Sequence, residues 1–347
     1  MTALLEIEDL RCSFQTQSGE VRAVDGVSFS IDTGETLGVV GESGSGKTVT
    51  AMSILRLFSA TTNVRLSGRV MFEGVDLLRA KGRDLRRVRG GRIGVIFQDP
   101  LTSLDPVMPV GDQIAEAIVL HKGLSRKAAW HRSIELLDRV GIPDPEKRAS
   151  DLPYQFSGGM RQRIMIAIAI SCDPKMLIAD EATTALDATV QAQVLALIDD
   201  IQRERGMATM VISHDFGVVA AVCDRVQVMY AGQVIERAPI GALLTTSSHP
   251  YTTALLQLVP KLDQTKHHRL RPIPGAPPVS NLGINGCRFA ERCQHRRSIC
   301  DDPPPLFDVA HGHTSACWLA DPNAAHGNAA HEQLAPVLAS QSGGQQL

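Results

Sequence analysis

The stretch GESGSGKT, residues Gly41–Thr48, decides the fold of this 347-residue chain. It fits the pattern G-x-x-x-x-G-K-[ST], in which glycines let successive backbone N–H groups point at phosphate oxygens. The β-rich segment Glu35–Gly41 precedes it and a helix-compatible segment follows it, so the loop opens a helix whose N-terminal end attracts anions. Lys47 can reach terminal phosphates, and the Thr48 hydroxyl can ligate Mg²⁺. The stretch therefore predicts a nucleotide-binding loop between a strand and a helix.

The sequence around this loop predicts further buried strands alternating with helices. The apolar segments that read as strands are Gly91–Gln98, Pro174–Glu181 and Ala208–His214. Between the last two, apolar residues recur at helical spacing over Val190–Ile201, as on an amphipathic helix with one buried face. This alternation indicates an α/β domain with a largely parallel sheet. Residues 99–171 are instead dominated by helical periodicity, which predicts an inserted helical subdomain.

The composition is that of a globular protein with no general affinity for polyanions. The chain is 44% hydrophobic and 21% charged, with a net charge of −2, so nothing attracts it globally to nucleic acid or to an anionic bilayer. The segment Arg79–Arg92 has seven basic residues but no aromatic stacking partners, which favours a solvated helix face and turn over a nucleic-acid patch. The start, MTALLEIEDL, lacks the features of a secretory signal, and no run approaches the roughly 20 apolar residues of a membrane span. We therefore expect a cytoplasmic protein that can still bind a membrane protein.

An acidic pair ends one of the predicted strands. In KMLIADE, Asp180 and Glu181 follow the apolar run, and they would lie beside the phosphate loop if the strands pack as in other P-loop folds. A carboxylate in that position can hold Mg²⁺, and its neighbour can orient and polarise an attacking water. Together with the phosphate loop, the pair predicts a site that hydrolyses a nucleoside triphosphate.

Four further motifs follow in a specific order. They are Gln98 after a strand, FSGGMRQR at Phe156–Arg163, TALD at Thr184–Asp187, and His214 after another strand. With the phosphate loop and the acidic pair, this series resembles the ATP-binding subunits of ABC transporters. The resemblance implies a P-loop NTPase (ABC ATPase) core that binds ATP and Mg²⁺.

The resemblance also implies a site that is shared between two ATPase chains. ATP bound to the phosphate loop of one chain would be covered by Ser157, Gly158 and Gly159 of its partner, because these residues open a helix with free N–H groups. The other residues expected to contact ATP or the dimer interface are Phe14, Ser43, Gly44, Ser45, Gly46, Lys47, Thr48, Val49 and Asp187. The expected catalytic residues are Glu181 as general base, His214, Gln98 and Lys47, and the expected Mg²⁺ ligands are Thr48, Gln98 and Asp180. Phe14 matches an adenine-stacking position, although an ordinary core position is the alternative.

The chain departs from the family pattern at two places. Phe156 and Met160 replace the commoner Leu and Gln of the signature, and Ala182 stands where the family usually has Pro. Neither departure removes a catalytic group, so we interpret this chain's own phosphate site as competent. The competence of the opposite site depends on another polypeptide.

Within the transporter ATPases, the chain resembles the dipeptide/oligopeptide importer ATPase subunits of bacteria. The resemblance rests on FQDPLTSLDPVMPVG (Phe97–Gly111), on HPYTTALL (His249–Leu256) and on a cysteine-rich tail, and it runs from about Leu5 to Trp318. It implies an ATPase on the cytoplasmic face of the bacterial inner membrane, bound peripherally. The implied partners are a second, related ATPase subunit in a heterodimer, two membrane permeases and an extracytoplasmic peptide-binding protein, with no nucleic acid.

Seven cysteines in a reducing compartment are not expected to form disulfides. Cys12, Cys172 and Cys223 are interpreted as small buried hydrophobic residues. The grouped cysteines, with five, six and sixteen residues between them, are Cys287, Cys293, Cys300 and Cys317. Thiolate ligation suits a 4Fe–4S cluster or a structural Zn²⁺, and four unligated thiols remain a third possibility. The resemblance favours the 4Fe–4S cluster, and His311 and His313 are left out as solvated loop residues.

The expected organisation has three parts: residues 1–256 form the ATP-binding domain, 257–326 a small irregular cysteine-rich domain, and 327–347 a disordered tail. Three other hypotheses remain open. The same ATPase could serve nickel, glutathione or sugar-linked cargo, because nothing in this chain contacts the cargo. A soluble ABC protein of translation or DNA repair is a remote alternative, and the cysteines could instead form a redox or iron sensor that gates ATP hydrolysis.

Overall fold

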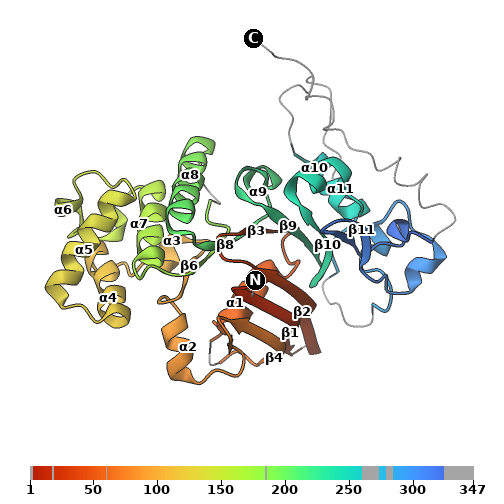
Figure 1. Cartoon of the computed structure of the whole chain (residues 1–347), viewed down its shortest axis with the longest axis horizontal. Helices are drawn as coiled ribbons and strands as arrows, with labels where there is room; N and C mark the ends of the chain where they lie inside the picture. Colours follow the sequence, from red (N-terminus) through yellow and green to blue (C-terminus); the bar gives the residue numbers. More distant parts are fainter. Residues whose placement is uncertain are drawn as a thin grey trace, which may run out of the picture.

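The computed structural model describes residues 3–17, 19–59, 61–183, 186–259, 273–278 and 284–323. A central sheet carries helices on its faces, a group of helices lies at one end, and residues 284–323 lie at the other end (Figure 1). The tail predicted to be disordered, 327–347, lies outside the described residues, as do Thr184 and Ala185 of the TALD stretch. Within the described residues, none of the helices has the length and apolar character that crossing a bilayer requires.

The main sheet has the strand order β11-β12-β10-β9-β3-β8-β7-β6. Its parallel centre consists of β3 (Thr36–Val40), β6 (Ile93–Ile96), β7 (Met176–Asp180), β8 (Ala208–Ser213) and β9 (Arg225–Tyr230). Three antiparallel strands extend one edge: β10 (Gln233–Pro239), β12 (His313–Ser315) and β11 (Phe307–Ala310). The predicted α/β class is therefore confirmed, with a sheet that is mixed rather than purely parallel.

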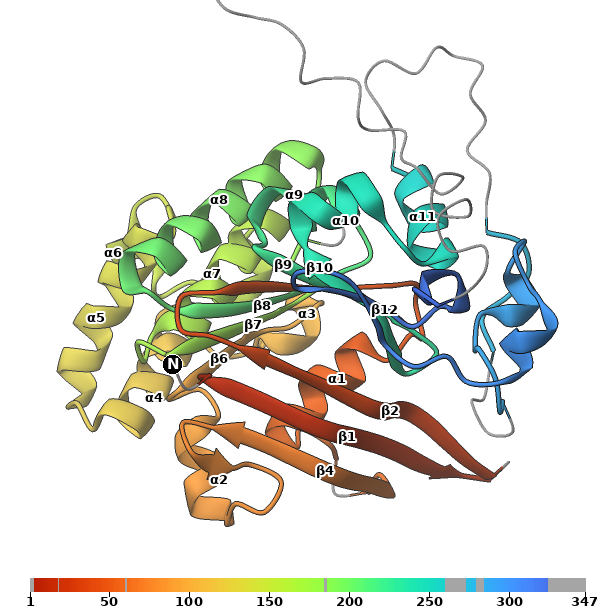
Figure 2. The same ribbon diagram turned by 45° about the vertical axis from the view of Figure 1, so that its right-hand side comes forward.

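A second, antiparallel sheet lies beside the phosphate-loop helix. Its order is β2-β1-β4-β5, and its strands are β1 (Leu5–Thr16), β2 (Gly19–Ile31), β4 (Val64–Phe72) and β5 (Val75–Asp76). Figure 2 shows α1 (Lys47–Leu55) between this sheet and the main sheet. The buried faces of both sheets and of α1 form one hydrophobic core. The sequence analysis did not separate this sheet from the rest of the α/β pattern.

The two faces of the main sheet are covered by different helices. On β7, Met176 and Ile178 belong to the core around α1, whereas Leu177 and Ala179 belong to the core of the helical region. Successive side chains of a strand point to opposite faces, so this alternation places α1 on one face and α7 (Gly158–Ile170) on the other. The helices α8 (Ala188–Arg205) and α9 (Phe216–Val222) also lie on the face opposite α1.

Residues 99–171 form the helical group seen at one end of Figure 1. Its α-helices are α3 (Pro100–Ser103), α4 (Val110–Lys122), α5 (Arg126–Arg139), α6 (Pro145–Arg148) and α7. Gly123, with φ 67°, ends α4, and the Ser125 hydroxyl accepts the Ala128 N–H to begin α5. Within the basic segment, α2 spans Gly82–Val88 and Arg89 donates to the Leu55 and Arg56 carbonyl oxygens (2.8 and 2.7 Å) at the end of α1.

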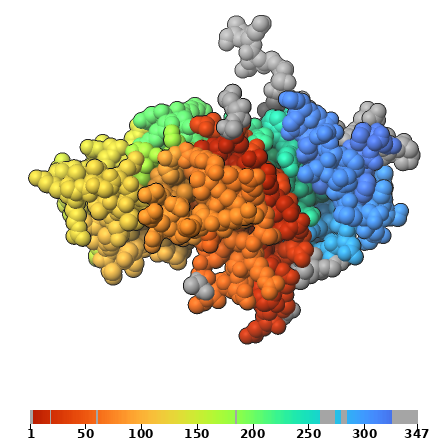
Figure 3. Space-filling model, turned by 60° about the horizontal axis from the view of Figure 1, so that its bottom comes forward, coloured from red at the N-terminus to blue at the C-terminus, as the bar shows by residue number. Residues whose placement is uncertain are grey.

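The expectation of a separate cysteine-rich domain is not supported by the structure. The described C-terminal residues join the main sheet, because β12 pairs with β10 through Glu236↔Ser315 and Arg237↔Thr314. The same region also contains three short 3-10 helices, which are η2 (Ala290–Arg292), η3 (Ser298–Asp301) and η4 (Trp318–Ala320). Figure 3 shows these residues, in blue, against the teal and red parts of the nucleotide-binding core. We refer to residues 284–323 as the C-terminal segment.

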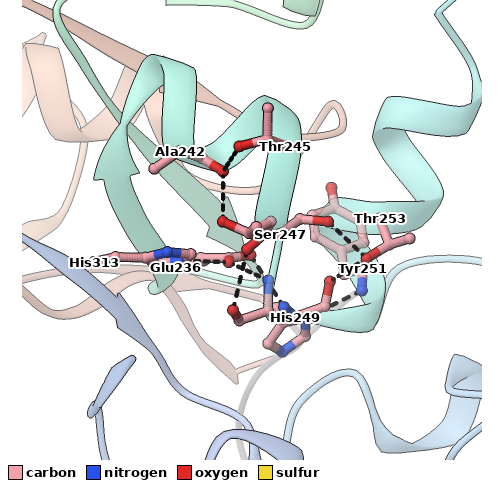
Figure 4. Close-up of polar contacts among 10 residues, drawn as sticks. Glu236, Ala242, Thr245, Ser247, His249, Tyr251, Thr253 and His313 are labelled. Atoms are coloured by element: carbon pink, nitrogen blue, oxygen red, sulfur yellow. Dashed lines mark hydrogen bonds and ion pairs between the residues drawn. The ribbon is translucent and has the colours of Figure 1, made fainter. Parts of the chain in front are cut away.

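A buried polar network fixes this segment to the core (Figure 4). Glu236 of β10 is fully buried, and its carboxylate accepts the backbone N–H groups of Ser248 and His249 (2.5 and 3.2 Å). It also bonds to Nε2 of His313 on β12 at 2.8 Å. Ser248 and His249 lie between α10 (Ile240–Thr246) and α11 (Pro250–Gln257). His313, which the sequence analysis treated as a solvated loop residue, is therefore a buried structural residue.

Candidate nucleotide site

The phosphate loop requires glycine where the backbone meets its neighbours. Gly41 has φ 153°, and a Cβ there would lie 2.2 Å from the Met229 carbonyl oxygen. Gly46, with φ 101°, caps α1, and a Cβ there would lie 2.5 Å from the carbonyl oxygen of Ala23. Both positions thus exclude larger residues, and they turn the chain from β3 into α1. The predicted strand–loop–helix arrangement is confirmed.

Lys47 lies at the start of α1 with only 4% of its surface exposed. Its ammonium group donates to the Gly41 carbonyl oxygen at 2.8 Å and to the Glu42 carbonyl oxygen at 3.0 Å. Burial lowers the pKa of Lys47, and the nearby carboxylates Glu181, Asp180 and Glu42 act in the opposite direction. The cation is therefore held inside the loop, close to these carboxylates.

The predicted Mg²⁺ ligands Thr48 and Asp180 are in direct contact. The Thr48 hydroxyl donates to Oδ1 of Asp180 at 3.0 Å, which joins the first turn of α1 to the end of β7. Burial raises the pKa of Asp180, and the Thr48 hydrogen bond and Lys47 oppose that rise. A hydroxyl and a buried carboxylate are hard oxygen donors, so these two residues fit a magnesium ion.

Glu181 is held between two side chains from neighbouring strands. Its Oε2 accepts a hydrogen bond from Nε2 of Gln98 at 2.7 Å, and its Oε1 lies 3.4 Å from Nδ1 of His214. Gln98 follows β6, and His214 follows β8, so the three side chains meet at the carboxyl ends of parallel strands. The backbone of Glu181 has φ 47°, a conformation that non-glycine residues adopt mainly where the surroundings enforce it. The structure thus brings Glu181, Gln98 and His214 together.

The signature residues lie apart from this chain's own phosphate loop. The Ser157 hydroxyl accepts the Met160 N–H at 3.4 Å and begins α7, while a Cβ at Gly159 would lie 2.7 Å from the Val190 side chain of α8. Asp187 begins α8 by accepting the Thr189 and Val190 N–H groups. In Figures 1 and 2, α7 and α1 lie on opposite sides of β6–β8. One chain therefore does not place the signature over its own phosphate loop.

Phe14, the candidate adenine platform, lies on β1 and is partly buried. Its ring contacts Phe58 edge to face, with ring centroids 5.8 Å apart. It packs against the core that surrounds α1. An adenine-stacking role stays a prediction.

The four grouped cysteines line one cavity of the C-terminal segment. The cavity is bounded by Cys287, Cys293, Cys300 and Cys317 and also by His249 and Trp318. Burial raises the pKa of Cys287 and Cys293, and it raises that of Cys317 to about 12, with the other three thiols adding to the effect. Among the described residues, no three His, Cys, Asp or Glu side chains converge to hold one metal ion. The predicted iron–sulfur site is therefore not supported as a formed centre.

The other cysteines are as predicted. Cys12, Cys172 and Cys223 are buried as free thiols, with exposed fractions of 0%, 1% and 6%. Burial raises the pKa of each of these thiols. Their interpretation as small hydrophobic residues is confirmed.

The similarity of this chain to known proteins agrees with a nucleotide site of this geometry. Residues 24–184 match the ABC transporter family, and residues 235–300 match the oligopeptide/dipeptide transporter C-terminal region. A probable peptide ABC transporter ATP-binding protein of Sinorhizobium fredii is 49% identical over 92% of this chain and 95% of its own length. The oligopeptide transport ATP-binding protein OppD of Bacillus subtilis is 47% identical over 93% of this chain and 91% of its own. This chain belongs to the ATP-binding proteins of peptide ABC transporters.

Solved structures of ABC transporter cassettes share the fold. A dimeric ATP-binding cassette in a post-hydrolysis state with ADP and Pi superposes with a TM-score of 0.61 at 24% identity, covering 68% of this chain and 98% of the cassette. The cassette cbiO1 from Clostridium perfringens gives a TM-score of 0.58 at 26% identity, covering 70% of this chain and 91% of its own. The ABC ATPase fold is thereby confirmed for this peptide-transporter ATP-binding protein.

Sequence reasoning missed one contact at the phosphate loop of this ABC ATPase. Glu42, the second residue of the loop, is bound by Arg292 of the C-terminal segment. Arg292 lies directly before Cys293, and only that cysteine drew attention to this part of the sequence. No local pattern could have paired residues that are 250 positions apart.

Proposed function

We propose that this chain is the ATP-hydrolysing subunit that powers import of dipeptides or oligopeptides through a membrane ABC transporter. The proposal of ATP hydrolysis rests on the position of Glu181, which is in contact with Gln98 and His214. Glu181 also lies close enough to Lys47 to influence its pKa, as Asp180 does. The peptide cargo is inferred from relatives named as oligopeptide and dipeptide transport ATP-binding proteins, each 47% identical to this chain.

In the proposed reaction, the Glu181 carboxylate accepts a proton from the water that attacks the γ-phosphate. Gln98 orients that water and the carboxylate together, and His214 stabilises the γ-phosphate. Lys47 would leave the loop carbonyls on ATP binding and neutralise charge on the terminal phosphates. Thr48, Asp180 and Gln98 would hold Mg²⁺, which supplies further neutralisation of phosphate charge.

The signature begins α7, which lies on the face of the sheet opposite α1, and this placement supports a site made by two chains. Ser157, Gly158 and Gly159 of one subunit would cover ATP on Ser43–Val49 of the other, with Asp187 at the interface. The free N–H groups and the positive end of α7 suit a γ-phosphate. We propose a second, related ATPase subunit as the partner, so that the pair is a heterodimer.

An exposed apolar surface next to Gln98 supports docking on membrane permeases. Phe97, Leu101 and Val107 are 43%, 65% and 80% exposed, and they lie in the stretch of chain that connects β6 to α4. Such a surface beside a residue that contacts Glu181 could couple permease movement to hydrolysis. The subunit would then be peripheral, on the cytoplasmic face of the inner membrane, with a peptide-binding protein on the other side.

The test of the proposed function is ATP hydrolysis by the assembled transporter in lipid vesicles. We expect the binding protein loaded with a mixed di- to pentapeptide library to raise ATP turnover several-fold. The unloaded binding protein, and the protein incubated with nickel or glutathione, serve as controls. Stimulation by nickel or glutathione but not by peptides would replace the peptide cargo with one of these alternatives.

We also propose that the cysteine cavity holds a 4Fe–4S cluster, with Zn²⁺ as the alternative. A zinc ion draws four thiolates to one point at about 2.3 Å, whereas each thiolate of a 4Fe–4S cluster binds a different iron and stands farther from the others. The cavity offers the four thiols that such a cluster requires, and these are Cys287, Cys293, Cys300 and Cys317. We further propose boundaries near residues 256 and 326, with the C-terminal segment attached to the nucleotide domain.

The metal content of the protein purified without oxygen tests this proposal. We expect about four irons and four acid-labile sulfides per chain, together with a visible absorption band. The variant Cys287→Ser should lose most of the iron, and Cys172→Ser, which changes a cysteine outside the cavity, should keep it. One zinc per chain, or no metal, would contradict the cluster while leaving the ATPase assignment in place.

A further inference from the structure

The C-terminal segment binds the phosphate loop directly through Arg292. Its Nη1 donates to Oε2 of Glu42 at 2.6 Å, and its Nη2 donates to Oε1 at 3.0 Å. The Arg292 side chain is 5% exposed and that of Glu42 is 25% exposed. A paired, two-bond contact of this kind fixes both the position and the orientation of the carboxylate.

The position of Arg292 is set by groups outside the phosphate loop. Its Nε donates to the carbonyl oxygen of Pro274 at 2.9 Å, and its Nη1 also donates to the Tyr230 hydroxyl at 3.3 Å. Its guanidinium carbon lies 5.9 Å from the ring centroid of Phe289, within the same segment. These contacts fix the guanidinium independently of the phosphate loop, so Arg292 holds the Glu42 side chain in place.

Glu42 connects this contact to the residue that binds phosphate. Its backbone N–H donates to the Tyr251 hydroxyl at 2.8 Å, and its carbonyl oxygen accepts from Lys47 at 3.0 Å. Any movement of Glu42 therefore moves an acceptor of the Lys47 ammonium group. The contacts that connect Arg292 to Lys47 therefore pass through a single loop residue, Glu42.

A second arginine of the segment reaches the same region. Arg288 donates to the carbonyl oxygen of Ala231 and pairs with Asp25. The next residue, Gly232, donates its N–H to the Ser45 carbonyl oxygen of the phosphate loop at 2.9 Å. The C-terminal segment thus supports the loop at two points, directly at Glu42 and through the β9–β10 turn at Ser45.

The charge of Glu42 gives this support a role in ATP binding. A free carboxylate in a loop that binds a polyanionic triphosphate would repel the phosphates, because like charges a few ångströms apart interact strongly near a partly buried site. Arg292 neutralises the carboxylate and holds it in one orientation. We propose that Arg292 is a positioning residue for ATP binding, through which the cysteine-bearing C-terminal segment sets the affinity of the phosphate loop.

This inference rests on the proposed function, and its test separates the two. We expect Arg292→Met to weaken binding of a fluorescent ATP analogue with Mg²⁺ to the purified full chain by about tenfold, equivalent to 1.4 kcal/mol. ATP turnover at saturating ATP in the assembled transporter should stay within twofold, because the contact affects ground state and transition state alike. Failure of the wild-type transporter to hydrolyse ATP would instead contradict the proposed function.

A double variant separates charge positioning from general stability. Glu42→Gln together with Arg292→Met leaves no free carboxylate on the loop, so we expect it to recover most of the lost affinity. Arg296→Met removes an exposed pair with Asp301 in the same segment and should leave affinity unchanged. Wild-type affinity in Arg292→Met, or no recovery in the double variant, would overturn the proposal.

If Arg292→Met does not fold, Arg292→Lys provides the test. Lysine keeps the positive charge but cannot make two parallel hydrogen bonds to the carboxylate. We therefore expect the affinity for the ATP analogue to fall about threefold, which is a smaller loss than that expected for Arg292→Met. Wild-type affinity in that variant would also overturn the proposal.

Discussion

Replacement of Glu181 by Gln should abolish turnover at this chain's ATP site while ATP still binds. The amide keeps the shape of the side chain, and it can still contact Gln98 and His214, which lie 2.7 and 3.4 Å from the carboxylate oxygens. It cannot accept a proton from the attacking water. General-base catalysis contributes about 10²- to 10⁴-fold, so we expect turnover to fall about 10³-fold.

The measurement must separate this chain's site from that of its partner. We would crosslink azido-ATP, labelled at either the α- or the γ-phosphate, to the assembled transporter and count the label on this chain. In Glu181→Gln both labels should remain in equal amounts, whereas the wild type should lose the γ-label. Glu135→Gln makes the same chemical change in an exposed pair with Arg132 and should behave as wild type. Loss of the γ-label from Glu181→Gln at the wild-type rate would exclude Glu181 as general base.

The phosphate loop and the strands around it could be predicted because their signals are local. Gly41 and Gly46 are required by close backbone contacts within the loop's own surroundings, and the acidic pair directly ends its strand. The roles of Gln98, Glu181 and His214 were expected from the resemblance to ABC transporter ATPases, and the structure brings the three side chains together at the carboxyl ends of parallel strands.

The rest depends on contacts between segments far apart in the chain. The pairing of β12 with β10 joins residues nearly eighty positions apart, and the sequence near His313 looks like an irregular loop. The antiparallel sheet around β1 was not separated from the α/β pattern, because it pairs β1 with β4, which follows only after β2, β3 and α1 in the chain. The Arg292–Glu42 contact likewise has no local signal. In each case a long-range partner, which local propensity does not specify, determines the structure.

The largest expected loss of stability comes from Glu236, whose buried side chain has three hydrogen-bond partners. Glu236→Ala would leave the N–H groups of Ser248 and His249, and Nε2 of His313, buried without their hydrogen-bond partner. Breaking a buried ionic or charge-assisted contact on one side costs about 3–5 kcal/mol, because the remaining groups stay desolvated. We expect the free energy of unfolding of the full chain to fall by that amount, measured by urea denaturation followed by circular dichroism.

The matched control is Glu73→Ala, which removes a surface pair with Arg92 and should cost under about 1 kcal/mol. A double-mutant cycle shows whether the effect passes through the C-terminal segment. His313→Leu alone should also destabilise the chain, and adding it to Glu236→Ala should cost much less than the sum, since both changes break one network. Strictly additive losses would mean that Glu236 only joins α10 to α11. Non-additive losses would mean that β12, and with it the segment that holds the phosphate loop, is fastened to the nucleotide domain at this carboxylate.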